Sequence, residues 1–201
     1  MIKILVLYYS KNGSTEKLAE QIARGVHKIP NCEAKLRTVM PIKENLNNNL
    51  PDIPDKGAPF ATLKDFANCD GLILGSPTRF GNMSAELKYF LDGTGSEWLS
   101  GALAGKPCAV FTSSSSMHGG QESTLLSMSL PLLHHGMLLV GVPYTETALL
   151  ETKSGGTPYG ASHIAKESND TRLTSEESDI AQALGSRVAE LALKINHSNQ
   201  N

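Results

Sequence analysis

The stretch Lys3–Thr15, KILVLYYSKNGST, contains an apolar run, a polar loop and the first residues of a helical pattern. Counted from Ile2 to Tyr9, the run is apolar apart from Lys3 and has the length of a strand, too short to cross a membrane. A strand that is apolar on both faces is typical of the middle of a parallel sheet, where helices cover both sides. The stretch therefore predicts an α/β protein whose first strand is central.

The loop after this strand has the residues of a phosphate cradle: Ser10, Lys11, Asn12, Gly13, Ser14 and Thr15. It offers three hydroxyls, a flexible glycine and the free N–H groups of a helix start, where the helix dipole favours an anion. It is not a Walker A loop, and it lacks the GxGxxG of a dinucleotide fold. The alternative is an ordinary strand-to-helix turn capped by Ser14 or Thr15, and the loop by itself does not choose between the two interpretations.

The composition is that of a globular protein of 201 residues, 40% hydrophobic and 19% charged. We expect one domain over residues 1–196 and a frayed tail at 197–201. A net charge of −2 gives no reason to expect nucleic acid, and no membrane insertion is expected either. Cys32, Cys69 and Cys108 have no CxxC spacing, and the N-terminus does not resemble a signal peptide, which together favour a reducing cytoplasm.

Strand-like and helix-like patterns alternate along the rest of the chain. Helical spacing is found at 15–28, 61–67, 121–134 and after Ser84, and strand-like runs at 32–39, 70–76, 106–112 and 136–142. Pro131 is expected to kink its helix or end it early. Thr174 and Glu177 form a capping box ahead of a last helix. Two segments without a clear pattern, 40–59 and 144–173, are interpreted as insertions.

Five strands alternating with helices predict a parallel sheet with helices on both faces. Three loops follow strand ends and are rich in Gly, Ser and Thr: residues 10–15, 77–83 and 113–120. In a strand order of 2-1-3-4-5, the first, third and fourth strands are neighbours. Their loops then converge on one site beyond the carboxyl ends of the strands, where ligands bind in such folds.

The three loops together are suited to a flat cofactor with a phosphate tail. The first loop can hold a phosphate monoester, while Gly81, Gly119 and Gly120 permit the close approach of a planar ring. Phe80 and Trp98 add aromatic surface. A phosphate at one end and a planar polar ring at the other describe FMN well, and a nucleotide less well.

Five stretches of the chain together resemble the WrbA family of flavodoxin-like NAD(P)H:quinone oxidoreductases. They are YYSKNGST at 8–15, SPTRFGNMSAELKYFLD at 76–92, HGGQESTL at 118–125, HHGM at 134–137 and GGTPYGAS at 155–162. The resemblance extends from Ile2 to about Leu193. It implies a flavodoxin-like three-layer sandwich with a five-stranded parallel sheet, and FMN as the cofactor. It also implies two-electron reduction of quinones by NADH or NADPH through the flavin, in a homotetramer with active sites at subunit contacts.

The resemblance also implies roles for single residues. Ser10 to Thr15 would hold the phosphate of FMN. The isoalloxazine ring would be held by Thr78, Arg79, Phe80, Ser113, Ser114, Ser115, Ser116, Met117, His118 and Gly119. Trp98 would wall the substrate space, and His134 would approach the flavin or quinone oxygens. Asn12 stands where some family members have an aromatic residue associated with the nicotinamide nucleotide, which puts the preferred donor in question.

Simpler explanations exist for some of these residues. A lone tryptophan such as Trp98 is usually structural, often at an interface. His134 and His135, near a helix end, can interact with the helix dipole, and as neighbours they point in different directions, so no metal site is expected. Two functional alternatives also remain open: a flavodoxin-type electron carrier, and a flavin-binding interaction protein without physiological turnover.

Overall fold

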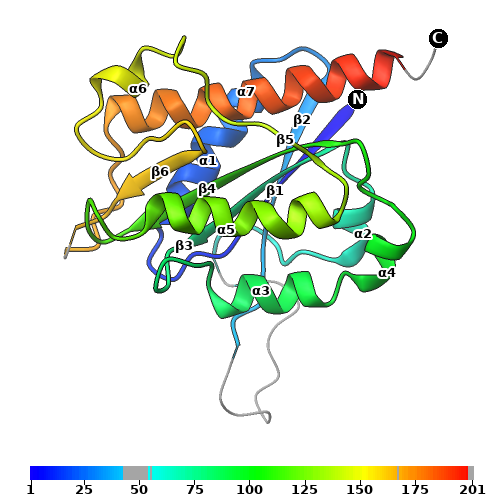
Figure 1. Ribbon diagram of the computed structural model, residues 1–201, viewed down its shortest axis with the longest axis horizontal. Helices are drawn as coiled ribbons and strands as arrows, with labels where there is room; N and C mark the ends of the chain where they lie inside the picture. Colours follow the sequence, from blue (N-terminus) through cyan, green and yellow to red (C-terminus); the bar gives the residue numbers. More distant parts are fainter. Residues whose placement is uncertain (43–53, 55, 167, 199–201) are drawn as a thin grey trace.

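The computed structural model describes residues 1–42, 54, 56–166 and 168–198. Its centre is a parallel sheet between two layers of helices (Figure 1). The predicted insertion at 40–59 lies mostly outside the described residues, as does the end of the predicted tail, 199–201. None of the described helices is long and apolar enough to span a membrane.

The sheet has the predicted strand order. Its strands β1 (Ile2–Tyr8), β2 (Cys32–Thr38), β3 (Gly71–Pro77), β4 (Pro107–Ser114) and β5 (Leu138–Leu139) lie in the order β2-β1-β3-β4-β5, all parallel. The carboxyl ends of β1, β3 and β4 therefore lie side by side. A sixth strand, β6 (Ala161–Ile164), is additional to the prediction: it lies within the predicted insertion 144–173 and pairs with β4.

The predicted fifth strand over 136–142 is wrong in its extent. Only Leu138 and Leu139 pair with β4, at its first two residues. The chain then leaves the sheet beside Pro158, whose carbonyl oxygen would be 2.3 Å from a Cβ added to Gly141. The second half of β4 is paired by β6 instead, so the edge strand is split in two, with residues 140–160 between its halves.

Two helical layers cover the sheet (Figure 1). One contains α1 (Ser14–His27), α6 (Ala148–Glu151) and α7 (Ser175–Ser198), and the other α2 (Leu63–Ala67), α3 (Ala85–Asp92), α4 (Gly95–Leu99) and α5 (Gln121–His134). Ile4, Val6 and Tyr8 of β1 pack into the core beneath α1 and α7, while Leu5 and Leu7 pack into the opposite core. Both faces of β1 are thus buried, which explains its continuous apolar run.

The helix-end predictions had different outcomes. The capping box is confirmed: Glu177 N–H donates to Thr174 Oγ1 at 3.1 Å, and Thr174 N–H donates to Glu177 Oε2 at 3.0 Å. The prediction that Pro131 ends its helix early is wrong, because α5 continues to His134. The missing N–H falls near the last turn of a helix whose core face is buried, so the loss of one hydrogen bond is tolerated.

Candidate cofactor site

The loops after β1, β3 and β4 do converge, as the strand order predicts, and they enclose a cavity of about 120 Å³. Ten of the predicted site residues line it: Ser10, Lys11, Asn12, Ser14, Thr15, Thr78, Arg79, Ser113, Ser114 and Ser115. Gly13 lies in the same loop, as the residue that precedes α1. We name this space the phosphate cavity.

The first loop is shaped by Gly13 and Ser10. Gly13 has a φ of +92°, a left-handed conformation that glycine adopts without strain, and it is the N-cap residue of α1. Ser10 Oγ accepts hydrogen bonds from Gly13 N–H at 3.1 Å and from Glu16 N–H at 3.3 Å. The interpretation of the loop as a turn capped by Ser14 or Thr15 is therefore wrong. Both residues are instead buried and line the phosphate cavity.

The first and third loops are joined by a pair of buried hydroxyls. Thr15 Oγ1 and Ser113 Oγ are 2.8 Å apart, and both residues line the phosphate cavity. The second loop joins the third through the backbone, where Thr78 N–H donates to Ser113 O at 2.8 Å. Three chain segments are thereby held at fixed positions around one space.

The electrostatics of the phosphate cavity favour an anion. Among its thirteen described lining residues, Lys11 and Arg79 are the charged ones, and none is Asp or Glu. The N-terminal end of α1 adds the positive end of a helix dipole. Hydroxyl and backbone donors together with two cations are the groups that bind a phosphate monoester. On the chemistry of its donors, the cavity therefore fits the phosphate of FMN.

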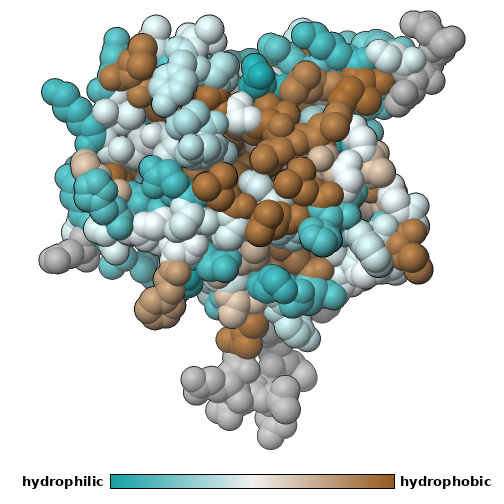
Figure 2. Space-filling view, viewed as in Figure 1, coloured by the Kyte–Doolittle hydropathy of each residue, from teal (hydrophilic) through white to brown (hydrophobic). Residues whose placement is uncertain are grey.

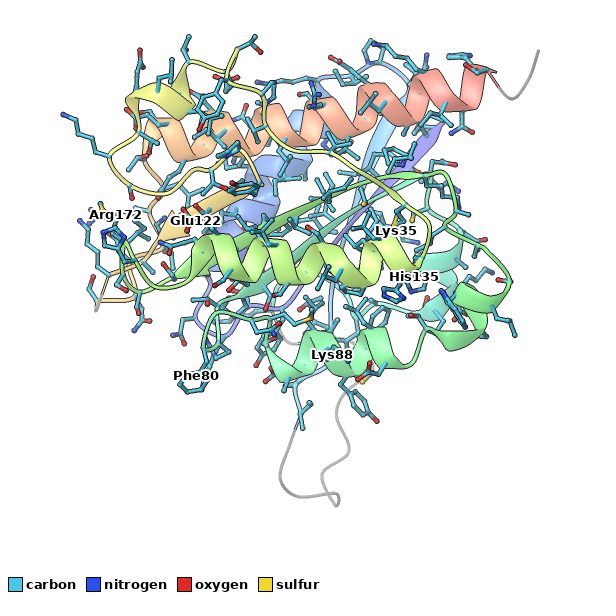
Figure 3. All side chains as sticks on the ribbon, in the orientation of Figure 1. Lys35, Phe80, Lys88, Glu122, His135 and Arg172 are labelled. Carbon is cyan, nitrogen blue, oxygen red and sulfur yellow. The ribbon has the colours of Figure 1, made fainter. Side chains whose placement is uncertain are left out.

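The loop after β3 presents an exposed aromatic side chain. Arg79 and Asn82 exchange backbone hydrogen bonds of 2.7 and 3.0 Å, which closes a tight turn around Phe80 and Gly81. Phe80 has a φ of +52° and a fully exposed side chain, which Figure 3 shows pointing away from the body of the protein. A left-handed backbone at a non-glycine residue costs about 1 kcal/mol or more, and such strain is typical of functional positions.

The loop after β4 is compact but lies largely outside the phosphate cavity. The carbonyl oxygen of Ser116 accepts hydrogen bonds from Ser114 Oγ at 2.7 Å and from Gly119 N–H at 3.1 Å. Met117 and His118 are exposed at its tip. Of this loop's predicted ring contacts, Ser115 lines the cavity, whereas Ser116 to Gly119 do not.

Trp98 and His134 lie together, but not at the phosphate cavity of the same chain. Trp98 Nε1 donates to the carbonyl oxygen of His134 at 2.9 Å, and both residues line a second cavity of about 540 Å³. Figure 3 shows His135, another lining residue of this second cavity, at the opposite end of the molecule from Phe80. The 14 residues of α5 separate His134 from the loop after β4, a distance of about 20 Å at 1.5 Å per residue.

His135 has a structural role. Its side chain is buried, its Nε2 lies 3.0 Å from Thr94 Oγ1, and its ring packs edge-on against Phe66. Burial lowers the pKa of this imidazole, which favours the neutral form.

Three further residues line the phosphate cavity and were missed: Pro77, Ala165 and Asn169. Asn12 Nδ2 donates to Asn169 Oδ1 at 2.9 Å, and both residues line the cavity. Asn169 belongs to the predicted insertion, and nothing in its local sequence indicates a ligand. The signal that would have located it is the pairing of β6 with β4, which brings this part of the chain to the carboxyl end of the sheet.

Solved structures with a similar fold define the class. A WrbA-like flavodoxin from Agrobacterium tumefaciens has a TM-score of 0.68 at 24% identity, over 96% of this chain and 99% of that one. Flavodoxin 1 from Bacillus cereus, in its oxidised form, has a TM-score of 0.60 at 19% identity, over 94% and 97%. The protein is thus an α/β protein of the flavodoxin-like class.

The sequence comparisons place the chain more narrowly. Residues 2–146 match the family model described as NADPH-dependent FMN reductase. A relative from Geobacter sulfurreducens, named NAD(P)H dehydrogenase (quinone), is 44% identical and aligns over 97% of this chain and all of its own length. The chain belongs to the NADPH-dependent FMN reductase family, and its resemblance to WrbA-type quinone oxidoreductases is confirmed.

Proposed function

We propose that this protein is an FMN-dependent NAD(P)H dehydrogenase that reduces quinones to hydroquinones. The observation that carries the proposal is the phosphate cavity, where buried hydroxyls, a helix N-terminus and two cations meet without a carboxylate among the described lining residues. When bound, FMN supplies the redox chemistry by taking a hydride from NADH or NADPH and passing two electrons to a quinone. The name of the 44% identical relative supports this reaction.

The residues of the chain bind and orient the cofactor. The phosphate is held through hydroxyls, amides and the first N–H groups of α1, by Ser10, Lys11, Asn12, Gly13, Ser14 and Thr15. The ring is held by Thr78, Arg79, Phe80 and the run Ser113, Ser114, Ser115, Ser116, Met117, His118 and Gly119. The exposed ring of Phe80 and the turn on which it stands support this assignment. The buried, free cysteines Cys32, Cys69 and Cys108 suit a cytoplasmic protein.

Trp98 and His134 act, in this proposal, at the flavin of another copy of the chain. They are about the length of α5 away from the ring loops of their own chain, roughly 20 Å, so a contact between chains is needed to bring them to a flavin. Exposed leucines on α5 and β5 support such a contact: Leu126, Leu130, Leu133, Leu138 and Leu139. Figure 2 shows a continuous hydrophobic area over this part of the molecule. We therefore assign the protein a homotetramer with active sites at subunit contacts.

The tetramer gives a testable prediction. Leu130 is 59% exposed on α5. The variant Leu130→Glu should dissociate the assembly, because a carboxylate would be buried at the contact. Analytical ultracentrifugation should give the mass of four chains for the unmodified protein and a smaller mass for the variant. Leu63→Glu, at an exposed leucine of α2 outside this area, is the matched control and should leave the mass unchanged. A monomer in both the unmodified protein and the control would contradict the assignment.

His134 is assigned to a quinone oxygen, where its imidazole can orient the substrate or donate a proton. His134→Ala should lower quinone turnover about fivefold, the worth of one ordinary hydrogen bond. FMN content should stay the same, since His134 is outside the phosphate cavity. Unchanged turnover would remove His134 from the mechanism.

One assay tests the proposed function against its alternatives. The FMN-loaded protein is mixed with NADH or NADPH, with and without benzoquinone, and nicotinamide oxidation is followed by absorbance. Fast oxidation that requires the quinone supports the enzyme. Reduction by a ferredoxin-type reductase alone would indicate a flavodoxin-type electron carrier, and tight FMN binding without turnover by either route would indicate an interaction protein.

A further inference from the structure

Residues 168–172, here named the covering segment, lie between β6 and α7. They contact the loop of residues 10–15, here named the phosphate loop. Asn169 accepts the hydrogen bond from Asn12 and lines the phosphate cavity. Thr171 packs on Gly13, where an added Cβ would be 3.3 Å from Thr171 Cγ2. Figure 3 shows Arg172, the last residue of the segment, at the same end of the molecule as Phe80. The covering segment therefore contributes one wall residue to the phosphate cavity and contacts the loop that precedes α1.

His163, in β6, ties the covering segment to the core. Its Nε2 is 2.7 Å from the carbonyl oxygen of Asp170, and its Nδ1 is 2.8 Å from Glu177 Oε2 at the start of α7. The side chains of His163 and Glu177 are 2% and 0% exposed. Asp170 also donates its backbone N–H to Ala165 O, at 2.6 Å. The imidazole thus bridges a buried carboxylate and a backbone carbonyl of a segment whose residues are exposed or half-buried.

The partners of His163 determine its protonation state. Glu177 accepts further hydrogen bonds from Ser154 Oγ, Gly155 N–H, Ile164 N–H and Thr174 N–H, so its carboxyl group is ionised. Burial alone would raise the pKa of Glu177, but the bonds from His163 and Thr174 outweigh it and lower the pKa to about 2. A carboxylate and a carbonyl can only accept, so both bonds exist only when the imidazole carries both of its protons.

The charges around the imidazole agree with this state. Burial lowers the pKa of His163, but the hydrogen bonds and negative charge of Glu177, with the carbonyl and charge of Asp170, exceed that effect and raise it above the ordinary value. Arg172 is paired with Asp170 at 3.0 Å. The other charged residues around the cavity that adjoins His163 are Glu151, Lys153, Lys166 and Glu176.

A neutral imidazole keeps one N–H and turns a lone pair toward its other partner. The bond to Glu177 is the one retained, because it joins the ring to a charged group that four further donors hold in place. The carbonyl of Asp170 then loses its donor. Since Asp170 lies next to Asn169, this loosens a residue that lines the phosphate cavity.

We propose that His163 is a positioning residue for the cofactor: as the imidazolium it holds the covering segment over the phosphate loop, and its deprotonation releases the segment and weakens FMN binding. The inference rests on the proposed FMN site. The effect is fully present below the ordinary pKa of histidine, near 6.5, and is lost as the pH rises through the raised pKa of His163. We expect FMN to bind about tenfold more weakly once the charge is lost, the scale of one charge-assisted hydrogen bond.

The test compares FMN dissociation constants, measured by flavin fluorescence between pH 5.5 and 9, in the unmodified protein and two variants. In His163→Asn, the amide nitrogen takes the place of Nδ1 and donates to Glu177, but nothing reaches Asp170. In His163→Gln, the amide nitrogen reaches the place of Nε2 and donates to Asp170 without titrating. The second ionisation of the FMN phosphate, near pH 6, is common to all three proteins and cancels in the comparison.

The unmodified protein should lose about tenfold in affinity relative to His163→Gln as the pH rises, and His163→Asn should be weak at every pH. The protection of the Asp170 amide against hydrogen exchange, relative to its intrinsic rate at each pH, should fall over the same pH range in the unmodified, FMN-free protein. This readout needs neither flavin nor variants. Parallel pH profiles in all three proteins, or the absence of the exchange step, would overturn the inference while leaving the FMN site intact. Absence of FMN binding at every pH would instead reject the proposed function, and the exchange step would still decide whether His163 anchors the segment.

Discussion

Gly185→Ala is expected to destabilise the protein by about 3 kcal/mol, because a single methyl group would separate α1 from α7. A Cβ on Gly185 would be 2.1 Å from the backbone oxygen of Ile22, and a Cβ on Gly25 would be 2.0 Å from that of Gln182. Ser186 Oγ donates to Gly25 O at 2.8 Å at the same crossing. The helices thus meet backbone to backbone, and neither carbonyl can move without shifting its helix. Urea unfolding followed by circular dichroism measures the loss.

Gly95→Ala is the matched control for this prediction. Gly95 is the first residue of α4, and an added Cβ there meets no atom within 4 Å. Alanine is also the better helix former, by up to about 1 kcal/mol, so this variant should be as stable as the unmodified protein or slightly more so. If Gly185→Ala unfolded at the same urea concentration as Gly95→Ala, the close crossing of α1 and α7 would be wrong.

The double variant Ser10→Ala, Thr15→Ala is expected to weaken FMN binding by at least about 2 kcal/mol, more than tenfold. Ser10 Oγ accepts two backbone N–H groups, so its own hydrogen is free to donate to a phosphate oxygen. Thr15 Oγ1 shares a hydrogen bond with Ser113 Oγ, and both hydroxyls line the phosphate cavity. The variant removes donors and also loosens the loop that presents them. Isothermal titration of the FMN-free protein with FMN gives the change directly.

Riboflavin and a second pair of serines provide the controls. Riboflavin lacks the phosphate, so its affinity should differ little between the double variant and the unmodified protein. Ser96→Ala with Ser100→Ala removes two hydroxyls from the region of α4, outside the phosphate cavity, and should leave FMN affinity unchanged. Equal FMN affinity in the double variant and in the unmodified protein would mean that the phosphate is bound elsewhere.

Much of the fold follows from local patterns in the chain. The apolar run at the N-terminus predicts a central strand because both of its faces are covered, and the structure buries Ile4 and Leu5 in opposite cores. Thr174 and Glu177 mark a helix start correctly because a capping box joins groups only three residues apart. Pro131 shows the limit of such rules, since the packing of the helix around it outweighs the local preference.

The candidate site, too, followed in part from local sequence patterns and in part only from the tertiary structure. The sequence by itself determined which loops carry hydroxyls and glycines, and the strand order then brought those loops to one edge of the sheet. Only the tertiary structure decided that Asn169 lines the phosphate cavity, that the edge strand is split into β5 and β6, and that Trp98 and His134 lie at the far end of α5. The physical reason is range: periodicity, capping and turn chemistry act between residues a few positions apart, whereas Asn12 meets Asn169 only through the pairing of β6 with β4.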